Sequence, residues 1–423
     1  MFIEHPTKIV KGTVQVPSSK SISNRALILQ YLFGADEVTI SNLSMAKDTE
    51  LLMQCLDQLA YHKSVLETNS KSSYVIDAWN AGTAFRFLTA LLATTPGNWI
   101  LTGDNRMQER PIKPLVDALL SLGADVSYMS KDGFPPLKIM GKKLEGGDVF
   151  MNTQQSSQFV NALLLVAPTF PQGLRIELEA NPVSESYIEN TLGVLKHFGI
   201  ECSRNQNIIE VQYTDRIKVG FAVEADWSSI AFFCLVAALA DVAEIIIENV
   251  SPKSIQGDII ISQIAVQYGV QFSFSDNQLW IIKNKFTSAT LTKKKLTLDF
   301  RSTPDLTQPV AAMSAGLGIE TDFLGIDHLA LKETDRLQAL ENELAKLNVD
   351  FKRKNDAYAL AVNVPIPTNS GISFQSYNDH RMAMALAPLC LKLGKVEINN
   401  PEVVGKSFPT YWDELIKLGF VIS

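Results

Sequence analysis

Cationic and hydroxyl side chains gather where a long apolar run begins near the amino terminus. Lys20, Ser21 and Arg25 lie in residues 18–29, which continue as Ala-Leu-Ile-Leu. The first N–H groups of a helix lack backbone partners and favour an anion. Hydrogen bonds to charged groups contribute about 1.5–3 kcal/mol each, against roughly 0.3–1 kcal/mol from the helix dipole. The segment therefore indicates either an anion site or an ordinary capped core helix, and alone it does not decide between them.

The same arrangement of a polar start and an apolar continuation recurs along the chain. Five later copies start near Asn80, Ser156, Ser228, Asp305 and Asp379. From Ser21 onward, successive starts lie 59, 76, 72, 77 and 74 residues apart, so the first copy is shortened. Each start precedes a run of β-branched residues, and from the second copy onward an amphipathic segment follows that ends at Gly or Asn. We predict six similar α/β repeats, each with two helices and several strands.

The length and composition predict a globular protein of two domains. A chain of 423 residues, 46% hydrophobic and 20% charged, exceeds what one hydrophobic core normally holds. Grouping the repeats three and three places the boundary near residues 222–226, with a crossover at 17–20. One domain then contains residues 1–17 and 226–423, and the other contains residues 18–225.

Several classes of function are disfavoured by the composition. A net charge of -7 argues against binding nucleic acid or an anionic membrane, although it permits a local basic pocket. The four cysteines and five histidines have no metal-ligand spacing, and no glycine-rich nucleotide loop is present, so we expect no metal or organic cofactor. The amino terminus does not resemble a signal peptide, and the longest apolar run is too short for a membrane span, so we expect a cytoplasmic protein.

Charged and hydroxyl side chains collect at two equivalent places in the repeats, the start of the first helix and the loop before the second. Arginines there offer planar donors for carboxylate or phosphate, and lysines offer point charges. Two carboxylates, Asp305 and Glu333, are suited to proton transfer, and cationic neighbours favour their ionised forms. Residues 331–337 alone would fit an exposed helix start, but their position in the repeat favours a site. The pattern predicts a small substrate with several anionic groups.

Six segments closely resemble motifs of the 5-enolpyruvylshikimate-3-phosphate synthase family. They are residues 17–27, 80–86, 106–111, 156–159, 331–337 and 378–384. The resemblance covers nearly the whole chain and implies an inside-out α/β fold of two domains, each of three βαβαββ-type units. It also implies transfer of the enolpyruvyl group of phosphoenolpyruvate to the 5-hydroxyl of shikimate 3-phosphate, through a tetrahedral intermediate. These two small molecules are then the partners, without a cofactor.

The resemblance also assigns residues to the site. Shikimate 3-phosphate is expected to contact Lys20, Ser21, Arg25, Ser156, Ser157, Gln158, Ser184, Asp305 and Lys332. Phosphoenolpyruvate is expected to contact Lys20, Asn80, Gly82, Arg110, Gln158, Arg336, Arg381 and Lys406. Asp305 would accept the proton of the attacking hydroxyl, Glu333 would deliver a proton to the methylene carbon, and Lys20 would stabilise charge. His328 stands where the family commonly has Asn and is left outside this set.

Two related enzymes are the nearest alternatives. The UDP-N-acetylglucosamine enolpyruvyl transferase has a similar architecture but uses a loop cysteine, and no cysteine lies between Met107 and Gln154. The RNA 3′-phosphate cyclase also has a similar fold, but the net charge of -7 and the lack of a nucleotide loop disfavour it. We therefore expect neither a nucleic-acid nor a membrane partner, and we expect a monomer.

Overall fold

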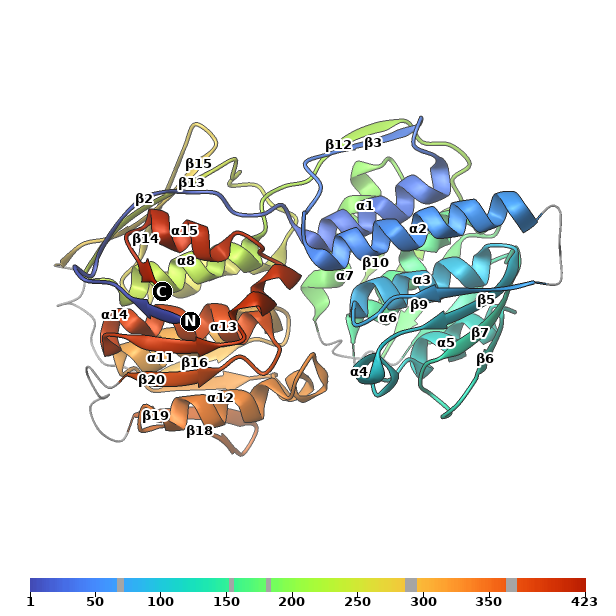
Figure 1. The fold of residues 1–423 in the computed structure, drawn as a ribbon. Coiled ribbons are helices and arrows are strands. Elements are labelled where there is room, and N and C mark those ends of the chain that lie inside the picture. Colours follow the sequence, from blue (N-terminus) through green and yellow to red (C-terminus); the bar gives the residue numbers. More distant parts are fainter. Residues whose placement is uncertain (67–71, 152–155, 180–183, 286–294, 363–370) are drawn as a thin grey trace. The chain divides into compact units, whose positions relative to one another are not determined.

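The computed structural model describes residues 1–66, 72–151, 156–179, 184–285, 295–362 and 371–423. The chain forms two compact units. Unit 1 contains residues 1–18 and 224–423, and unit 2 contains residues 19–223. Each unit has a separate hydrophobic core. In Figure 1 the first strand of the chain lies beside red carboxy-terminal segments of unit 1, so the two ends of the chain share one unit.

Unit 1 has three four-stranded sheets of one design, in which a parallel pair is followed by two antiparallel strands. The first consists of β2 (Ile9–Val14), β13 (Val242–Glu248), β15 (Gln278–Lys283) and β14 (Gln271–Ser275). The second consists of β16 (Leu296–Asp299), β17 (Thr321–Leu324), β19 (Ala357–Val362) and β18 (Val349–Lys354). The third consists of β20 (Ile372–Gln375), β21 (Val396–Asn399), β1 (Phe2–Glu4) and β22 (Val421–Ile422).

Unit 2 repeats this design twice and then departs from it. The first full sheet consists of β4 (Ser73–Asp77), β5 (Gly97–Thr102), β7 (Leu137–Gly141) and β6 (Asp125–Tyr128). The second consists of β8 (Gly147–Met151), β9 (Leu174–Leu178), β11 (Ile208–Val211) and β10 (Cys202–Asn205). The third sheet is only the parallel pair β12 (Val219–Ala222) and β3 (Val38–Ser41). In the described residues the first repeat thus lacks the antiparallel pair of the other five. This explains why its starting residue lies only 59 residues before the next one.

Three apolar helices pack against one another at the centre of each unit. They are α1 (Lys20–Phe33), α3 (Gly82–Thr94) and α6 (Ser157–Val166) in unit 2, and α8 (Trp227–Leu239), α11 (Thr307–Leu317) and α13 (His380–Leu386) in unit 1. Helix α8 is buried along nearly its whole length, because almost all of its side chains are apolar. Helices at the centre and sheets around them give the inside-out α/β arrangement that the resemblance implied. The prediction of six α/β repeats is confirmed.

The second helices of the repeats are amphipathic, or short, and pack nearer the surface. They are α2 (Lys47–Leu66), α5 (Lys113–Ser121), α7 (Glu185–His197), α9 (Ile261–Val266), α12 (Arg336–Ala345) and α15 (Tyr411–Lys417). The predicted stop signals are confirmed, since Gly199 after α7 and Asn348 after α12 adopt positive φ values of 75° and 59°. The short helices are α4 (Asn105–Gln108), α14 (Cys390–Leu393), η1 (Ala167–Thr169), η2 (Gly257–Ile260), η3 (Pro304–Leu306), η4 (Asp327–Leu331), η5 (Ala387–Leu389) and η6 (Pro401–Lys406). None of the helices in the described ranges is long and apolar enough to cross a bilayer.

Candidate active site

A buried arginine at the start of α12 binds three carboxylates of unit 1. Arg336 is 2% exposed, and its Nε donates to Asp379 Oδ2 over 2.7 Å. Its Nη1 donates to Asp305 Oδ1 at 3.2 Å, and its Nη2 donates to Glu333 Oε2 at 2.9 Å. Burial opposes the charge, but Asp379, Glu333 and Asp305 outweigh it and raise the pKa of Arg336 well above its ordinary value. The guanidinium therefore stays charged and fixes the three acids around it.

Asp305 lies in η3 and is bound by a second arginine. Arg381 Nη2 donates to Asp305 Oδ2 at 2.9 Å, and its Nη1 donates to the Asp305 backbone oxygen at 3.3 Å. Burial acts to raise the pKa of Asp305, but Arg381, then Arg336 and Lys332, outweigh burial and hold that pKa well below its usual range. The carboxylate of Asp305 is therefore ionised and can accept a hydrogen bond from a hydroxyl group.

Local capping places these side chains. Asp379 is the N-cap of α13, and its Oδ1 accepts from the N–H of Arg381 at 2.9 Å. Asp335 caps α12 in the same way and directs Arg336 into the first turn of that helix. The carboxylate of Glu333, bound by Arg336 on one oxygen, lies 3.8 Å from Lys406 Nζ on the other. Unit 1 thus joins five predicted site residues, which are Asp305, Glu333, Arg336, Arg381 and Lys406.

His328 lies near this cluster in η4 and is 8% exposed. Burial, followed by the charge of Lys332, lowers the pKa of His328 to about 3. Its imidazole is therefore neutral at physiological pH and can act as a polar group but not as a cation. His380, the first residue of α13, is also buried, and its Nδ1 lies 3.7 Å from Asp379 Oδ1.

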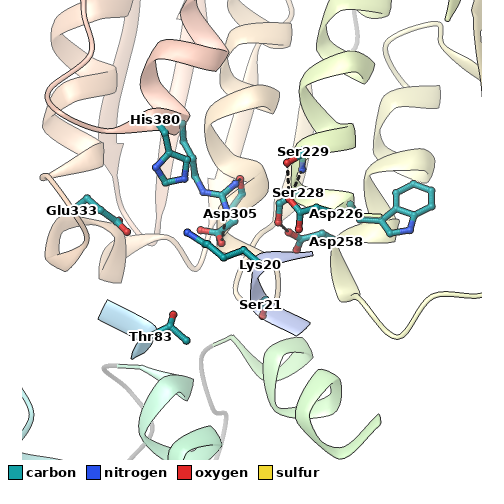
Figure 2. Close-up of polar contacts among 12 residues, drawn as sticks. Lys20, Ser21, Thr83, Asp226, Ser228, Ser229, Asp258, Asp305, Glu333 and His380 are labelled. Atoms are coloured by element: carbon teal, nitrogen blue, oxygen red, sulfur yellow. Dashed lines mark hydrogen bonds and ion pairs between the residues drawn. The ribbon is translucent and has the colours of Figure 1, made fainter. Parts of the chain in front are cut away.

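The start of α8 has acidic residues that the sequence reasoning did not include. Figure 2 shows Ser229 bonded to Asp226 and Ser228 bonded to Asp258. Asp226 is the N-cap of α8, whereas Asp258 lies in η2, the start of the second helix of this repeat. Burial first, and then the charge of Asp305, raise the pKa of Asp258 to about 7 despite the Ser228 hydrogen bond. The two carboxyls therefore differ, since Asp226 caps a helix and the pKa of Asp258 lies near neutral pH.

In unit 2, α1 begins with a serine N-cap. Ser19 Oγ accepts from the N–H of Ile22 at 3.4 Å, and Lys20 is the first helical residue. Lys20 Nζ is 3.0 Å from Asp48 Oδ2, in an ion pair that is mostly buried. Asp48 lies in the first turn of α2, so it occupies in the first repeat the place that Asp258 occupies in the fourth.

Arg25 lies one turn further into α1 and is 2% exposed. Its Nε donates to Thr191 Oγ1 at 2.7 Å, its Nη1 to Ser21 Oγ at 2.5 Å, and its Nη2 to the Tyr187 backbone oxygen at 3.0 Å. Its guanidinium carbon also lies 5.7 Å from the centre of the Phe87 ring. Burial lowers the pKa of Arg25 to about 10, with Tyr187 opposing. All three hydrogen-bonded partners are neutral oxygens.

The other two first helices of unit 2 bring further predicted residues to its polar ends. A Cβ on Gly82, the first residue of α3, would lie 2.5 Å from Arg110 Nη1, so the arginine packs where a side chain would stand. Ser156 caps α6 by accepting from the N–H of Gln158, whose Nε2 donates to Thr83 Oγ1 at 3.1 Å. The remaining predicted residues are half-buried Asn80 before α3, buried Ser157 on α6, and buried Ser184, the N-cap of α7.

Asp48 and Asp258 are the clearest residues that sequence reasoning missed. Both stand at the start of a second helix, a place already identified as rich in function in the other four repeats. The repeat is a signal that points to both positions, although their side chains are acidic rather than cationic or hydroxyl. Over the described ranges, no group of three or more His, Cys, Asp or Glu side chains is arranged to hold a metal ion.

Comparisons with known proteins decide the family. A family model described as EPSP synthase (3-phosphoshikimate 1-carboxyvinyltransferase) matches residues 4–415. The chain belongs to the EPSP synthase family. A 3-phosphoshikimate 1-carboxyvinyltransferase of Bacteroides fragilis is 38% identical over 416 residues, covering 98% of this chain and 97% of that protein. One from Shewanella piezotolerans is 35% identical over 425 residues, covering 97% of each.

A solved EPSP synthase from Acinetobacter baumannii has the same fold as this family member. The TM-score is 0.73 at 20% sequence identity, covering 100% of this chain and 99% of that one. The α/β repeats of the chain therefore form the architecture of that enzyme.

Proposed function

We propose that this protein transfers the enolpyruvyl group of phosphoenolpyruvate to the 5-hydroxyl of shikimate 3-phosphate. The products are 5-enolpyruvylshikimate 3-phosphate and inorganic phosphate. Family membership and the names of the relatives support this reaction. The observation that carries the proposal is the cluster of Asp305, Glu333 and Arg336, in which two acids are held beside buried cations. The two alternative enzymes are not favoured by any of the comparisons.

The reaction needs one group that accepts a proton and another that donates one. Asp305 takes the proton of the 5-hydroxyl as its oxygen bonds to C2 of phosphoenolpyruvate, and Glu333 protonates C3. The Glu333 carboxylate then takes a proton back from C3 of the tetrahedral product as phosphate leaves C2, which restores the double bond. The proton held by Asp305 leaves with the phosphate, so both carboxyl groups return to their starting forms. A low pKa keeps Asp305 ionised for the first step, as Arg381 and Arg336 ensure. Glu333 has a cation near each oxygen, with Arg336 Nη2 at 2.9 Å and Lys406 Nζ at 3.8 Å.

The anionic groups of the substrates need cationic and hydroxyl partners. We assign shikimate 3-phosphate to Lys20, Ser21, Arg25, Ser156, Ser157, Gln158, Ser184, Asp305 and Lys332. We assign phosphoenolpyruvate to Lys20, Asn80, Gly82, Arg110, Gln158, Arg336, Arg381 and Lys406. Lys20 stabilises charge at the reacting centre. We propose that the two compact units are two domains.

We also propose that the protein works in a reducing, cytoplasmic compartment as a monomer. All four cysteines are free, and three of them are buried. Disulfides are rare in such compartments, where thiols stay reduced. Size-exclusion chromatography with light scattering tests the monomer, for which a mass near 46.7 kDa is expected.

A two-substrate assay tests the proposed function. Purified protein should release phosphate only when shikimate 3-phosphate and phosphoenolpyruvate are both present. UDP-N-acetylglucosamine in place of shikimate 3-phosphate is the matched control and should give no release. No phosphate with saturating shikimate 3-phosphate and phosphoenolpyruvate would refute the assignment, and release with the control substrate would favour the related transferase.

A further inference from the structure

Glu343 is a buried carboxylate that the proposed chemistry does not use. It lies on α12 seven residues after Arg336, which places both side chains on one face of the helix. Its exposed fraction is 1%, and a buried carboxylate is unfavourable unless hydrogen bonds compensate it. Lys346 Nζ, 2.7 Å from Glu343 Oε2, supplies one such bond. The other partners come from a different part of unit 1.

Both of those partners belong to residues 375–379, which comprise the end of β20 and the short segment that joins it to α13. The N–H of Gln375 donates to Glu343 Oε2 at 3.0 Å, and the Tyr377 hydroxyl donates to Glu343 Oε1 at 2.9 Å. The same hydroxyl accepts from Asn342 Nδ2 at 3.3 Å. Two consecutive residues of α12, Asn342 and Glu343, therefore hold this segment at two points, Gln375 and Tyr377.

The backbone of the segment is strained. Tyr377 and Asn378 both have φ of 54°, in the left-handed region that residues other than glycine rarely adopt. Such conformations persist only where the surroundings hold them, and they cluster at functional sites. The hydrogen bonds to Glu343 are contacts of this kind.

The strained segment ends at Asp379, the carboxylate that binds Arg336. Asp379 is fully buried, and its N–H donates to the Ser376 backbone oxygen at 2.9 Å. Its Oδ2 accepts from Arg336 Nε at 2.7 Å. The contacts thus form a closed ring, in which α12 holds the segment through Glu343 and the segment holds α12 in return at Arg336.

We infer that Glu343 and Tyr377 are positioning residues for the phosphoenolpyruvate side of the active site, an inference that rests on the proposed function. They hold Asp379 against Nε of Arg336, so that Nη1 and Nη2 are directed to Asp305 and Glu333. A carboxylate suits the task because both of its oxygens accept, one from each point of the segment. An amide offers one acceptor and one donor, and it would oppose one of the two contacts.

Tyr377→Phe and Glu343→Gln test this role, with Tyr268→Phe as the matched control. Tyr268 also has a buried hydroxyl in unit 1, bonded to Ser314 Oγ at 2.8 Å, but it lies outside the ring. We expect Tyr377→Phe to raise KM for phosphoenolpyruvate about 5-fold, the worth of one hydrogen bond, with KM for shikimate 3-phosphate and kcat within about 2-fold of wild type. Glu343→Gln should raise KM for phosphoenolpyruvate by the same factor or more. Tyr268→Phe should leave all three constants unchanged.

Hydrogen exchange provides a readout that needs no substrate. The amides of Asp379 and Arg381 should exchange faster in Tyr377→Phe than in wild type or Tyr268→Phe, because both are bonded within the segment. Equal KM changes in the two tyrosine variants, or unchanged exchange in Tyr377→Phe, would overturn the positioning role. A wild type that releases no phosphate would instead refute the proposed function. The exchange result would still test whether Tyr377 holds the segment before α13 in place.

Discussion

The buried arginines of the two units have opposite surroundings. Arg336 of unit 1 donates to three carboxylates, whereas Arg25 of unit 2 donates to neutral oxygens of Ser21, Thr191 and Tyr187. Burial lowers the pKa of Arg25 to about 10, but carboxylates overcome burial at Arg336 and raise its pKa. Carboxylates therefore neutralise Arg336 within unit 1, while Arg25 meets only neutral groups among its described contacts.

This difference separates two tasks. An anion that reaches Arg25 adds a full charge where only neutral partners stand, so it gains a strong charge-assisted bond. An anion that reaches Arg336 or Arg381 shares them with Asp305 and Glu333. Unit 2 is therefore suited to holding a phosphate, and unit 1 is suited to redistributing charge while protons move.

Glu333→Gln should have the largest effect, because it removes the proposed proton donor from the cluster around Arg336. We expect kcat to fall by about 10²- to 10⁴-fold, the usual contribution of general acid catalysis, with smaller changes in KM. Steady-state kinetics with both substrates measures this. Glu341→Gln, on the same helix α12 but outside the cluster, should retain wild-type kcat. A variant in which only KM rises would assign Glu333 to binding.

The free energies of unfolding of Arg336→Met and Arg25→Met compare the surroundings of the two arginines directly. Loss of Arg336 leaves buried Asp379 and half-buried Asp305 without that cation, so we expect a loss of about 3–5 kcal/mol in the free energy of unfolding. Loss of Arg25 leaves only neutral groups unpaired, for which about 1–3 kcal/mol is expected. Urea unfolding at pH 7 gives both values. Equal losses in the free energy of unfolding would contradict the difference between the surroundings of Arg336 and Arg25.

Arg25→Met should also weaken binding of shikimate 3-phosphate. We expect KM for that substrate to rise about 100-fold, as two charge-assisted hydrogen bonds are lost, while KM for phosphoenolpyruvate changes little. Arg175→Met, which removes a partly exposed arginine of β9 in the same unit, is the control. If KM for phosphoenolpyruvate rose instead, the assignment of the two substrates would have to be exchanged.

Gly82→Ala tests the packing of Arg110 in unit 2. The added Cβ would lie 2.5 Å from Arg110 Nη1, so the guanidinium must move. We expect KM for phosphoenolpyruvate to rise about 10-fold, the cost of weakening one hydrogen bond to a charged group. Gly220→Ala, whose Cβ would meet nothing closer than 3.5 Å, should have no effect. A wild-type KM in Gly82→Ala would show that Arg110 can shift without loss.

The smallest effect concerns pH. The folded-state pKa of Asp305 lies below the value near 4 of an unfolded aspartate, so its stabilisation is complete above about pH 4 and is lost as the pH falls toward the folded pKa. The difference in urea midpoint between wild type and Asp305→Asn should therefore narrow from pH 6 to pH 3. The difference between wild type and Arg25→Met should stay constant over that range, because its three bonded partners do not titrate there. A constant difference for Asp305→Asn would contradict its low pKa.

Much of the fold could be predicted because it depends on local, repeated signals. Apolar runs with polar starts and β-branched segments recur six times, Gly or Asn stops recur five times, and the runs and segments correspond to helices and strands of the structure. The sheet partners could not be predicted in this way. The strand at residues 9–14 precedes α1 in sequence but pairs with β13 of unit 1, and β12 pairs with β3 of unit 2. Strand pairing across such sequence separations depends on the fold as a whole.

By itself, the sequence determined the repeat and the types of residue that gather at the helix starts, since these follow from spacing and composition. Its motifs and its similarity to known proteins determined the family. Only the tertiary structure decided which acid meets which cation. Arg336 and Asp379 lie 43 residues apart in sequence, yet they share a 2.7 Å hydrogen bond. Likewise, Glu343 looks like an ordinary helical glutamate until the fold brings the Gln375–Tyr377 segment onto it. Side-chain pairing of this kind depends on distances of a few ångströms between distant segments, and local sequence signals do not specify them.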